Sequence, residues 1–507
     1  PKTAWPPTSA PAFAKTWHIE DGDITVKAGD TKGTNKVSQG ESTDVPDTDT
    51  VITNREKNAS SNTVTIETND KNDKVEVTLK DVNIDTSSRN KAAVSVTGEG
   101  DTNIKLDGDN ALKSDIYRSG IYGSGSGSLT ISGGENDSLT AQGGSGANGI
   151  SSSGSLTISG GTVTANGDDG GRGISSSGSV TISGGSTVTA NGGNGTISGG
   201  DGICSNGGVT ISGGSTVTAN GGNGGSLVGG DGIRSGGGLT VSDGTVTAKG
   251  GNGDSKDGYG GDGIRSGGVI TISGNTVNAA GGYGGKVGGY GICSFDRVAI
   301  SGGTVEAAGG NGSTGGGSGI YSSVIDLSGS LELTAKAGSP NGKALLQAGH
   351  ELDLDTIKDK LGPGAKVTVT DADGKVNQVS IPRPVEPEEP VIPEESSSSS
   401  DGGSATPSTP ASPLPGLTVT DKSGAVISYT STQSGNTLTV CVGRFTASFR
   451  ISLAALRQLR AEGIETITFQ TILCSTTLSV DELLAMGGED AEAVLTHRLT
   501  DSSLTVG

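Results

Sequence analysis

Short runs in which apolar and polar residues alternate mark the chain from residue 121 onward. A Gly-Ile pair recurs every 24 to 31 residues, at Ile121, Ile150, Ile174, Ile203, Ile233, Ile264, Ile292 and Ile320. Within one unit the pair opens the first of three runs, and the other two are Val180-Thr-Ile182 and Val188-Thr-Ala190. The runs are short enough for β-strands and are followed by Gly-Gly or Asn-Gly, which favour turns. A period of this length predicts a solenoid with three strands in each unit.

Three strands in each unit predict one triangular coil of a parallel β-helix. Stacked coils pair each strand with its counterparts about 4.8 Å above and below. Alternation assigns the two faces: we expect Ile174, Val180, Ile182, Val188 and Ala190 to point inward, and Thr181, Thr187 and Thr189 to point outward. One coil cannot bury its apolar face alone, so both ends of the stack need caps.

Changes in this pattern divide the chain into five segments. We expect an N-terminal segment and cap at residues 1–62, the parallel β-helix at 63–340, and a C-terminal cap containing a short helix at 341–381. Residues 382–416 are rich in Pro, Glu and Ser and predict an extended linker. Residues 417–507 have ordinary composition and include a helix pattern that begins after Ser452 and ends at Gly463. The predicted fold class is all-β, a β-helix followed by a separate small α/β domain.

Composition and charge narrow the function classes. The 91 Gly residues and the aromatic content of 3% leave only thin aliphatic layers for a core. The net charge of −20 argues against nucleic acid as a partner, but it is compatible with calcium and polar glycans. No apolar run is long enough to predict membrane insertion. The Ser/Thr/Gly/Asn bias and the Pro/Ser stalk are common in exported proteins, so we expect a secreted or cell-surface location.

Three stretches near the N-terminus carry a family resemblance: WHIEDGDITVKA at 17–28, VTLKDVNID at 77–85 and IKLDGDNALKS at 104–114, followed by Gly-Ile and LTISGG units. Together they resemble the carbohydrate-binding-domain-containing, adhesin-like β-helix surface proteins of clostridia and related gut bacteria. The resemblance implies a right-handed parallel β-helix, secretion, calcium sites and affinity for plant or host polysaccharide. No catalytic residues carry over from this family. The chain departs from calcium-rich members because it has few clustered acidic residues.

A row of acidic residues precedes successive Ile positions by two residues, at Asp201, Asp231 and Asp262. Stacked carboxylates repel one another unless they are paired or bound to metal. Arg234 and Arg265 follow three residues later and are the simplest partners. Calcium bridging between coils is a second interpretation. A third is catalysis of the polysaccharide lyase or hydrolase type, which some β-helices support at such a face.

Aromatic residues gather in the last regular coils, at Tyr259, Tyr283, Tyr290, Phe295 and Tyr321. Sugar rings stack on exposed aromatic faces, so these residues, with Arg234 and Arg265, form the candidate glycan surface. The alternative is that the tyrosines fill gaps between glycine loops. We interpret the recurrent Gly-Gly-Asn-Gly and Gly-Gly-Asp-Gly segments themselves as turns.

The residue after each inward Ile predicts an outward ladder of Tyr122, Ser151, Ser175, Cys204, Arg234, Arg265, Cys293 and Tyr321. Cys204 and Cys293 lie three coils apart and are too distant to form a disulfide. The third strands present ranks of Thr-x-Thr, which suit either an outward strand position or an ice-binding face. The ranks are interrupted at Asn278 and Glu306.

These patterns predict a binding protein without catalytic residues, an adhesin or scaffold that recognises polysaccharide or host glycans through a β-helix face. The alternatives are an adhesin for a host protein such as an immunoglobulin or matrix component, a polysaccharide lyase or hydrolase, and an ice-binding protein. Calcium is the one cofactor that the sequence leaves open.

Overall fold

The computed structural model describes residues 13–382 and, with short gaps, residues 414–507; the gaps are 415, 422–423, 428, 443, 445, 472–474, 489–490 and 498–501. The chain divides into two compact units, residues 1–387 and residues 388–507. Nearly all of the linker predicted at 382–416 lies outside the described residues.

The first unit is a parallel β-helix, and the Gly-Ile pairs open the strands of its first column between residues 121 and 320. This column consists of β2 (Ile24–Ala28), β5 (Val64–Glu67), β8 (Val94–Thr97), β11 (Ile121–Gly123), β14 (Ile150–Ser152), β17 (Ile174–Ser176), β20 (Ile203–Ser205), β23 (Ile233–Ser235), β26 (Ile264–Ser266), the starts of β29 (Ile292–Ile300) and β31 (Ile320–Leu327), and β33 (Leu345–Gln347). Each Ile pairs with the Ile of the next coil, as the period predicts.

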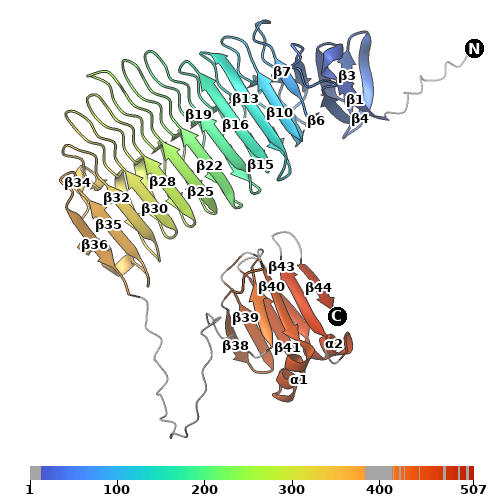
Figure 1. Cartoon of the computed structure of the whole chain (residues 1–507), viewed down its shortest axis with the longest axis vertical. Helices are drawn as coiled ribbons and strands as arrows, with labels where there is room; N and C mark the ends of the chain where they lie inside the picture. The colour runs from blue at the N-terminus through green and yellow to red at the C-terminus, as the bar shows by residue number, and fades with distance from the viewer. Residues whose placement is uncertain are drawn as a thin grey trace, which may run out of the picture. The chain divides into compact units, whose positions relative to one another are not determined.

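The second and third columns complete each coil. The second contains the end of β4 (Ser42–Thr53), β6 (Lys74–Lys80), β9 (Asp101–Asp107), β12 (Leu129–Ser132), β15 (Leu156–Ser159), β18 (Val180–Ser183), β21 (Val209–Ile211), β24 (Leu239–Val241), β27 (Ile270–Ile272) and the later parts of β29 and β31. The third contains β7 (Asn83–Asp85), β10 (Asp109–Lys113), β13 (Ser138–Ser145), β16 (Thr162–Asp168), β19 (Thr187–Asn191), β22 (Ser215–Asn220), β25 (Gly244–Lys249), β28 (Thr276–Ala280), β30 (Thr304–Ala308), β32 (Glu332–Lys336) and β35 (Lys366–Thr370). Figure 1 shows the third column as one continuous sheet.

The core of the helix is a stack of thin aliphatic layers. All five residues expected to point inward in one coil, Ile174, Val180, Ile182, Val188 and Ala190, are at most 1% exposed. Thr181, Thr187 and Thr189 are partly or fully exposed on the outside. The predicted alternation is therefore confirmed.

Both ends of the stack are closed by antiparallel strands. At the N-terminus, β3 (Asn35–Gln39) pairs antiparallel with β2 and β4, while β1 (Phe13–His18) pairs with β4 and is followed by a 3₁₀ turn, η1 (Ile19–Asp21). At the C-terminus come β34 (His350–Glu351), the short 3₁₀ helix η2 (Leu354–Lys360) and β36 (Val376–Ser380), which runs antiparallel to β35. Parallel pairing extends from β2 to β35, beyond the predicted limits of 63 and 340 on both sides.

The glycine-rich segments of the later coils are more than the turns that the sequence predicts. Each leaves the third strand and returns to the next first strand as two extended arms (Figure 1). A zigzag of backbone hydrogen bonds joins the two arms of each loop to one another and to the arms of the next coil. Each glycine in the series donates its N–H to the carbonyl of the one that follows: Gly338, Gly317, Gly310, Gly289, Gly282, Gly261, Gly251, Gly230, Gly222, Gly200, Gly193 and Gly171. We call this layer the glycine flange. An added Cβ at Gly251 would overlap the carbonyl oxygen of Gly222, so only glycine permits this packing.

The second unit is a small α/β domain with two four-stranded sheets. One sheet contains β37 (Leu417–Thr420), β40 (Ala447–Ser452), β43 (Glu492–His497) and β44 (Ser502–Val506), and the other contains β38 (Thr430–Ser434), β39 (Thr437–Cys441), β41 (Thr466–Gln470) and β42 (Ser475–Ser479). The helices are α1 (Leu453–Ala461) and α2 (Val480–Ala485). As predicted, Ser452 caps α1 by accepting the N–H of Ala455 at 3.2 Å. No helix in the described part of the chain is long and apolar enough to cross a membrane.

Candidate functional site

The outward ladder of the first column differs in exposure from coil to coil. Tyr122 is 43% exposed and Arg234 is also exposed, whereas Cys204 and Cys293 are buried. Both cysteines are free thiols, as the spacing predicts. Burial raises the pKa of Cys204 to about 11 and that of Cys293 to about 12, so neither is a ready nucleophile at neutral pH.

The acidic row is a hydrogen-bonded ladder at the base of the glycine flange. The Oδ1 of Asp201 accepts the N–H of Asp231 at 2.9 Å, and the Oδ1 of Asp231 accepts the N–H of Asp262 at 2.7 Å. The Oδ1 of Asp262 continues the ladder by accepting the N–H of Tyr290 at 2.7 Å. All three aspartates are nearly buried, with 4 to 6% exposed.

Only part of the predicted charge pairing is confirmed. Arg265 lies 3.5 Å from Asp262, as the three-residue spacing suggests. Asp201 instead pairs at 3.2 Å with Arg172 of the preceding coil, which the sequence did not single out. Among the described residues, the prediction that Arg234 pairs with Asp231 is wrong: no ion pair joins them. Arg234 is exposed and acts only electrostatically on Asp262, and no ion pair to Asp231 forms among the described residues.

Burial controls the protonation of the two later aspartates. Burial, together with the charges of Asp262 and Asp201, raises the pKa of Asp231 to about 8. Burial also raises the pKa of Asp262, to about 6, while the Tyr290 N–H and Arg265 act in the opposite direction. No group of three or more His, Cys, Asp or Glu in the described residues is arranged to hold a metal ion, and calcium at this row remains an untested expectation.

Three of the predicted aromatic residues meet beside this row. The rings of Tyr290 and Tyr321 stack with centroids 5.0 Å apart, and the guanidinium of Arg265 lies 5.1 Å from the centroid of Phe295. The side chain of Arg265 is therefore shared between Asp262 and Phe295. This cluster is satisfied largely by its own members.

The other two predicted aromatics belong to a separate place. Tyr259 and Tyr283 lie at the outer tips of the flange loops, where they are 43% and 47% exposed. Tyr259 bridges to Val287, and Lys286 lies 5.6 Å from the centroid of its ring. The N–H of Tyr283 is held by the Oδ1 of Asn252 at 2.9 Å. The candidate glycan surface expected from the sequence is thus divided into a base cluster and a loop-tip cluster.

The Thr ranks of the third column are in register over four coils. Thr164, Thr189, Thr218 and Thr247 pair in succession, and Asn278 and Glu306 interrupt the rank as predicted. The ice-binding alternative that rests on this rank is still a prediction.

An open groove on the first-column face of the early coils was missed by the sequence reasoning. Its volume is about 360 Å³. Its lining combines the hydroxyl residues Thr63, Thr65, Ser95, Thr97 and Ser124 with Asn90, Lys91, Arg118 and Tyr122. An adjoining hollow of about 220 Å³ shares Arg118 and Tyr122 and adds Tyr117. We call the two together the early-coil groove. Tyr122 in the outward ladder was the one signal that pointed to it.

Two short loops place the charged side chains of the early-coil groove. Asn90 and Tyr117 both adopt positive φ, 52° and 59°, which is unusual outside glycine. A carboxylate oxygen of Asp115 accepts the N–H of Asn90, and the Oδ1 of Asn90 accepts a bond from Arg118 Nε at 3.3 Å. The two loops, which belong to successive coils, are therefore tied together at the groove.

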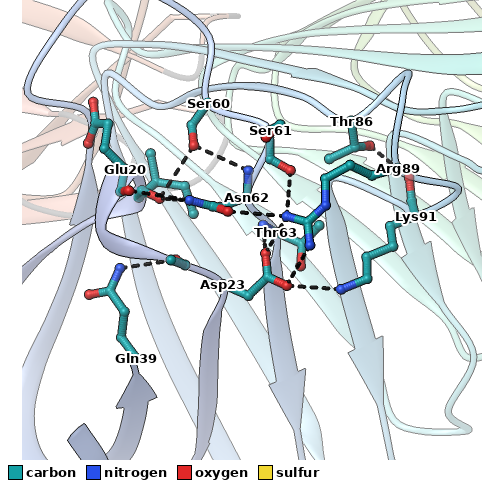
Figure 2. Close-up of polar contacts among 12 residues, drawn as sticks. Glu20, Asp23, Gln39, Ser60, Ser61, Asn62, Thr63, Thr86, Arg89 and Lys91 are labelled. Atoms are coloured by element: carbon teal, nitrogen blue, oxygen red, sulfur yellow. Dashed lines mark hydrogen bonds and ion pairs between the residues drawn. The ribbon is translucent and has the colours of Figure 1, made fainter. Parts of the chain in front are cut away.

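Lys91 is anchored from below by Asp23, which precedes β2. Figure 2 shows Asp23 between Arg89 and Lys91, with Lys91 Nζ 2.9 Å from Oδ2 and Arg89 bound to both carboxylate oxygens at 2.9 and 3.1 Å. The N–H of Thr63 donates a further bond at 2.9 Å. Burial alone would raise the pKa of Asp23, but the bonds from Lys91, Arg89 and Thr63 outweigh it and lower the pKa to about 2. Two cations thus share one carboxylate.

The chain matches no protein-family model, no curated protein and no solved structure.

Proposed function

We propose that this chain is a secreted or cell-surface binding protein that recognises polysaccharide or glycan through the first-column face of its β-helix, at the early-coil groove. The observation that carries the proposal is the groove lining. An exposed aromatic ring, Tyr122, lies among five hydroxyl side chains, one amide and two cations. Sugars present apolar ring faces and many hydroxyls, and this combination of an aromatic face with convergent polar groups suits them.

The base cluster is a weaker candidate because its groups already satisfy one another. Tyr290 covers one face of Tyr321, and Arg265 is engaged by Asp262 and Phe295. A ligand there has to compete with these contacts. In the early-coil groove, Tyr122 has no stacked aromatic neighbour among the described residues, and Arg118 forms no ion pair with them. Free polar and aromatic groups on a rigid support favour binding because little order is lost.

The early coils also provide a rigid platform. Tyr122 lies in β11, whose neighbours β8 and β14 pair with it on both sides. Ser95 and Ser151 are its partners in the ladder, so the ring stands above short side chains. A flat aromatic face flanked by serines leaves room for a sugar ring to approach.

The test is a glycan array probed with the full chain, followed by titration of the best ligand. We expect Tyr122→Ala to weaken binding about tenfold, because stacking on the ring is lost. Tyr259→Ala is the matched control, since that tyrosine has the same exposure of 43% but lies on the flange. It should bind like the unaltered chain.

The proposal fails if no glycan binds, or if Tyr259→Ala rather than Tyr122→Ala abolishes binding. Thermal unfolding of both variants controls for folding. Capture of a host protein by a chain that binds no glycan supports the alternative of a protein adhesin instead.

A further inference from the structure

The early-coil groove has a charge that is opposite to that of the chain as a whole. The chain has a formal net charge of −20. Nevertheless, no Asp or Glu is among the residues that line either part of the groove, while Lys91 and Arg118 both are. We infer that the groove selects an anionic saccharide, one that carries carboxylate or sulfate groups. This inference rests on the proposed function and names its ligand class.

The nearby carboxylates do not cancel this charge. Asp23 lies below Lys91 and is shared with Arg89, so this trio keeps one positive charge in excess. Asp115 uses its carboxylate to hold the backbone N–H groups of Asn90 and Ile116. Glu67, in register with the groove residue Thr97, is paired with Lys27 at 3.5 Å and adds no net charge. Three cations, Arg89, Lys91 and Arg118, against Asp23 and Asp115 therefore leave one net positive charge around the groove. Because Asp23 has a pKa of about 2, this balance holds throughout the neutral range.

Arg118 is the group best suited to bind the anionic substituent. Its guanidinium is exposed and forms no ion pair among the described residues, and its one side-chain hydrogen bond among them, to Asn90, uses only Nε. The two terminal nitrogens are left to donate in parallel, which is the geometry that matches carboxylate and sulfate oxygens. Tyr122 borders both parts of the groove together with Arg118, so a sugar ring on the tyrosine brings its charged substituent to the guanidinium.

Short hydroxyl side chains supply the rest of the contacts. Thr65 and Ser95 pair in register across β5 and β8, and Ser95 pairs with Tyr122 in β11. The three positions are therefore spaced about 4.8 Å apart along the stack. A chain of hydroxyls beside a cation and an aromatic ring contacts the neutral part of a saccharide, while the cations set the preference for the anion.

The experiment compares polymers that share a sugar backbone but differ in charge, using the full chain and isothermal titration calorimetry. One pair is polygalacturonate and its fully methyl-esterified form, and the other is dextran sulfate and dextran. We expect the charged member of at least one pair to bind about tenfold or more tightly than its neutral partner. The pair that shows the difference identifies carboxylate or sulfate as the anion. Raising the ionic strength to about 1 M should remove the preference, since the Debye length falls to about 3 Å.

Variants assign the preference to the groove. Arg118→Gln should bring the charged and neutral polymers to similar affinity, whereas Arg118→Lys should retain part of the difference. Arg444→Gln removes one positive charge from an exposed arginine of the second unit and should leave the preference unchanged. Matching thermal unfolding of all three variants shows that they fold.

The outcomes separate the inference from the proposed function. Equal binding of both members of each pair, or binding of neutral glycans alone, overturns the anionic class and leaves glycan binding in place. A preference that survives Arg118→Gln also overturns the inference. Absence of binding to every polymer and every arrayed glycan overturns both.

Discussion

The loop that joins the third strand of one coil to the first strand of the next is built in two ways along the helix. In the early coils, between β7 and β11, it is short and carries Arg89, Lys91, Tyr117 and Arg118 on its surface. In the later coils it lengthens into the glycine flange, where backbone packs directly against backbone. A layer packed in this way leaves room for side chains only at its base and toward its tips. Apart from those positions, this edge of the fold therefore exposes a cluster of charged and aromatic side chains only in the early coils, where the loops are not packed through glycine.

The largest effect is expected from substitutions of the buried glycines in the flange, because these should destabilise the fold most. We expect Gly251→Ala to lower the free energy of unfolding by more than about 4 kcal/mol, in the range reserved for severe substitutions, because the new Cβ overlaps the Gly222 carbonyl. Gly315→Ala is the matched control, since its added Cβ meets only Val287, at 3.8 Å. Its cost should stay within about 0.5 kcal/mol.

Chemical denaturation followed by circular dichroism measures both variants. Equal stability of Gly251→Ala and Gly315→Ala would show that the flange arms are loosely packed and that their order does not depend on glycine.

The flange also contains two side-chain ladders. In both, a side-chain oxygen accepts a backbone N–H of the next coil, but one ladder consists of neutral amides and the other of carboxyl groups. Next to Gly222 and Gly251 of the flange, Asn223 and Asn252 accept the N–H of the residue one coil on, at 2.8 and 2.9 Å. At the base, Asp231 does the same for Asp262 at 2.7 Å. An amide therefore provides the acceptor that the fold needs, whereas Asp231 can ionise at a buried position where it forms no ion pair with the described residues.

Asp231→Asn sharpens this second comparison. The pKa of Asp231 is raised from its ordinary value to about 8, so the folded chain holds a proton that the unfolded chain releases above about pH 4. Stability is full below that pH and is lost as pH rises toward 8. The variant keeps the acceptor but cannot ionise, so it should be more stable than the unaltered chain at pH 8, by up to about 5 kcal/mol, and similar at pH 4.

Thermal unfolding between pH 4 and pH 8 follows the effect. Asp254→Asn makes the same change at an exposed loop position, and its pH profile should match that of the unaltered chain. If the difference in stability between Asp231→Asn and the unaltered chain were the same at every pH, it would contradict the raised pKa of Asp231.

The parts of the fold that follow a strict period were predictable from the sequence. The Gly-Ile pairs set the register, and alternation placed residues such as Val180 and Ile182 in the core. The glycine flange was read as turns because backbone-to-backbone contacts leave no side-chain pattern beyond glycine itself. The cap of α1 was foreseen because Ser452 and Gly463 act within one helix.

The candidate site was harder to predict because its residues come from different coils. Thr63, Lys91 and Arg118 are each separated by 27 or 28 residues and belong to irregular early coils, where no repeat signals their proximity. The pairing of Asp201 with Arg172 crosses from one coil to the next in the same way. The aromatic residues of the later coils appeared as one group in the sequence, but the length of the flange separates Tyr259 and Tyr283 from Tyr290.

Amide hydrogen exchange with and without the polysaccharide that binds best tests the location of recognition most directly. If the polysaccharide binds at the early-coil groove, we expect slower amide exchange in peptides that cover residues 86–124. Exchange in the flange between residues 192 and 317 should not change. Protection confined to residues 250–321, with no change in residues 86–124, would contradict it.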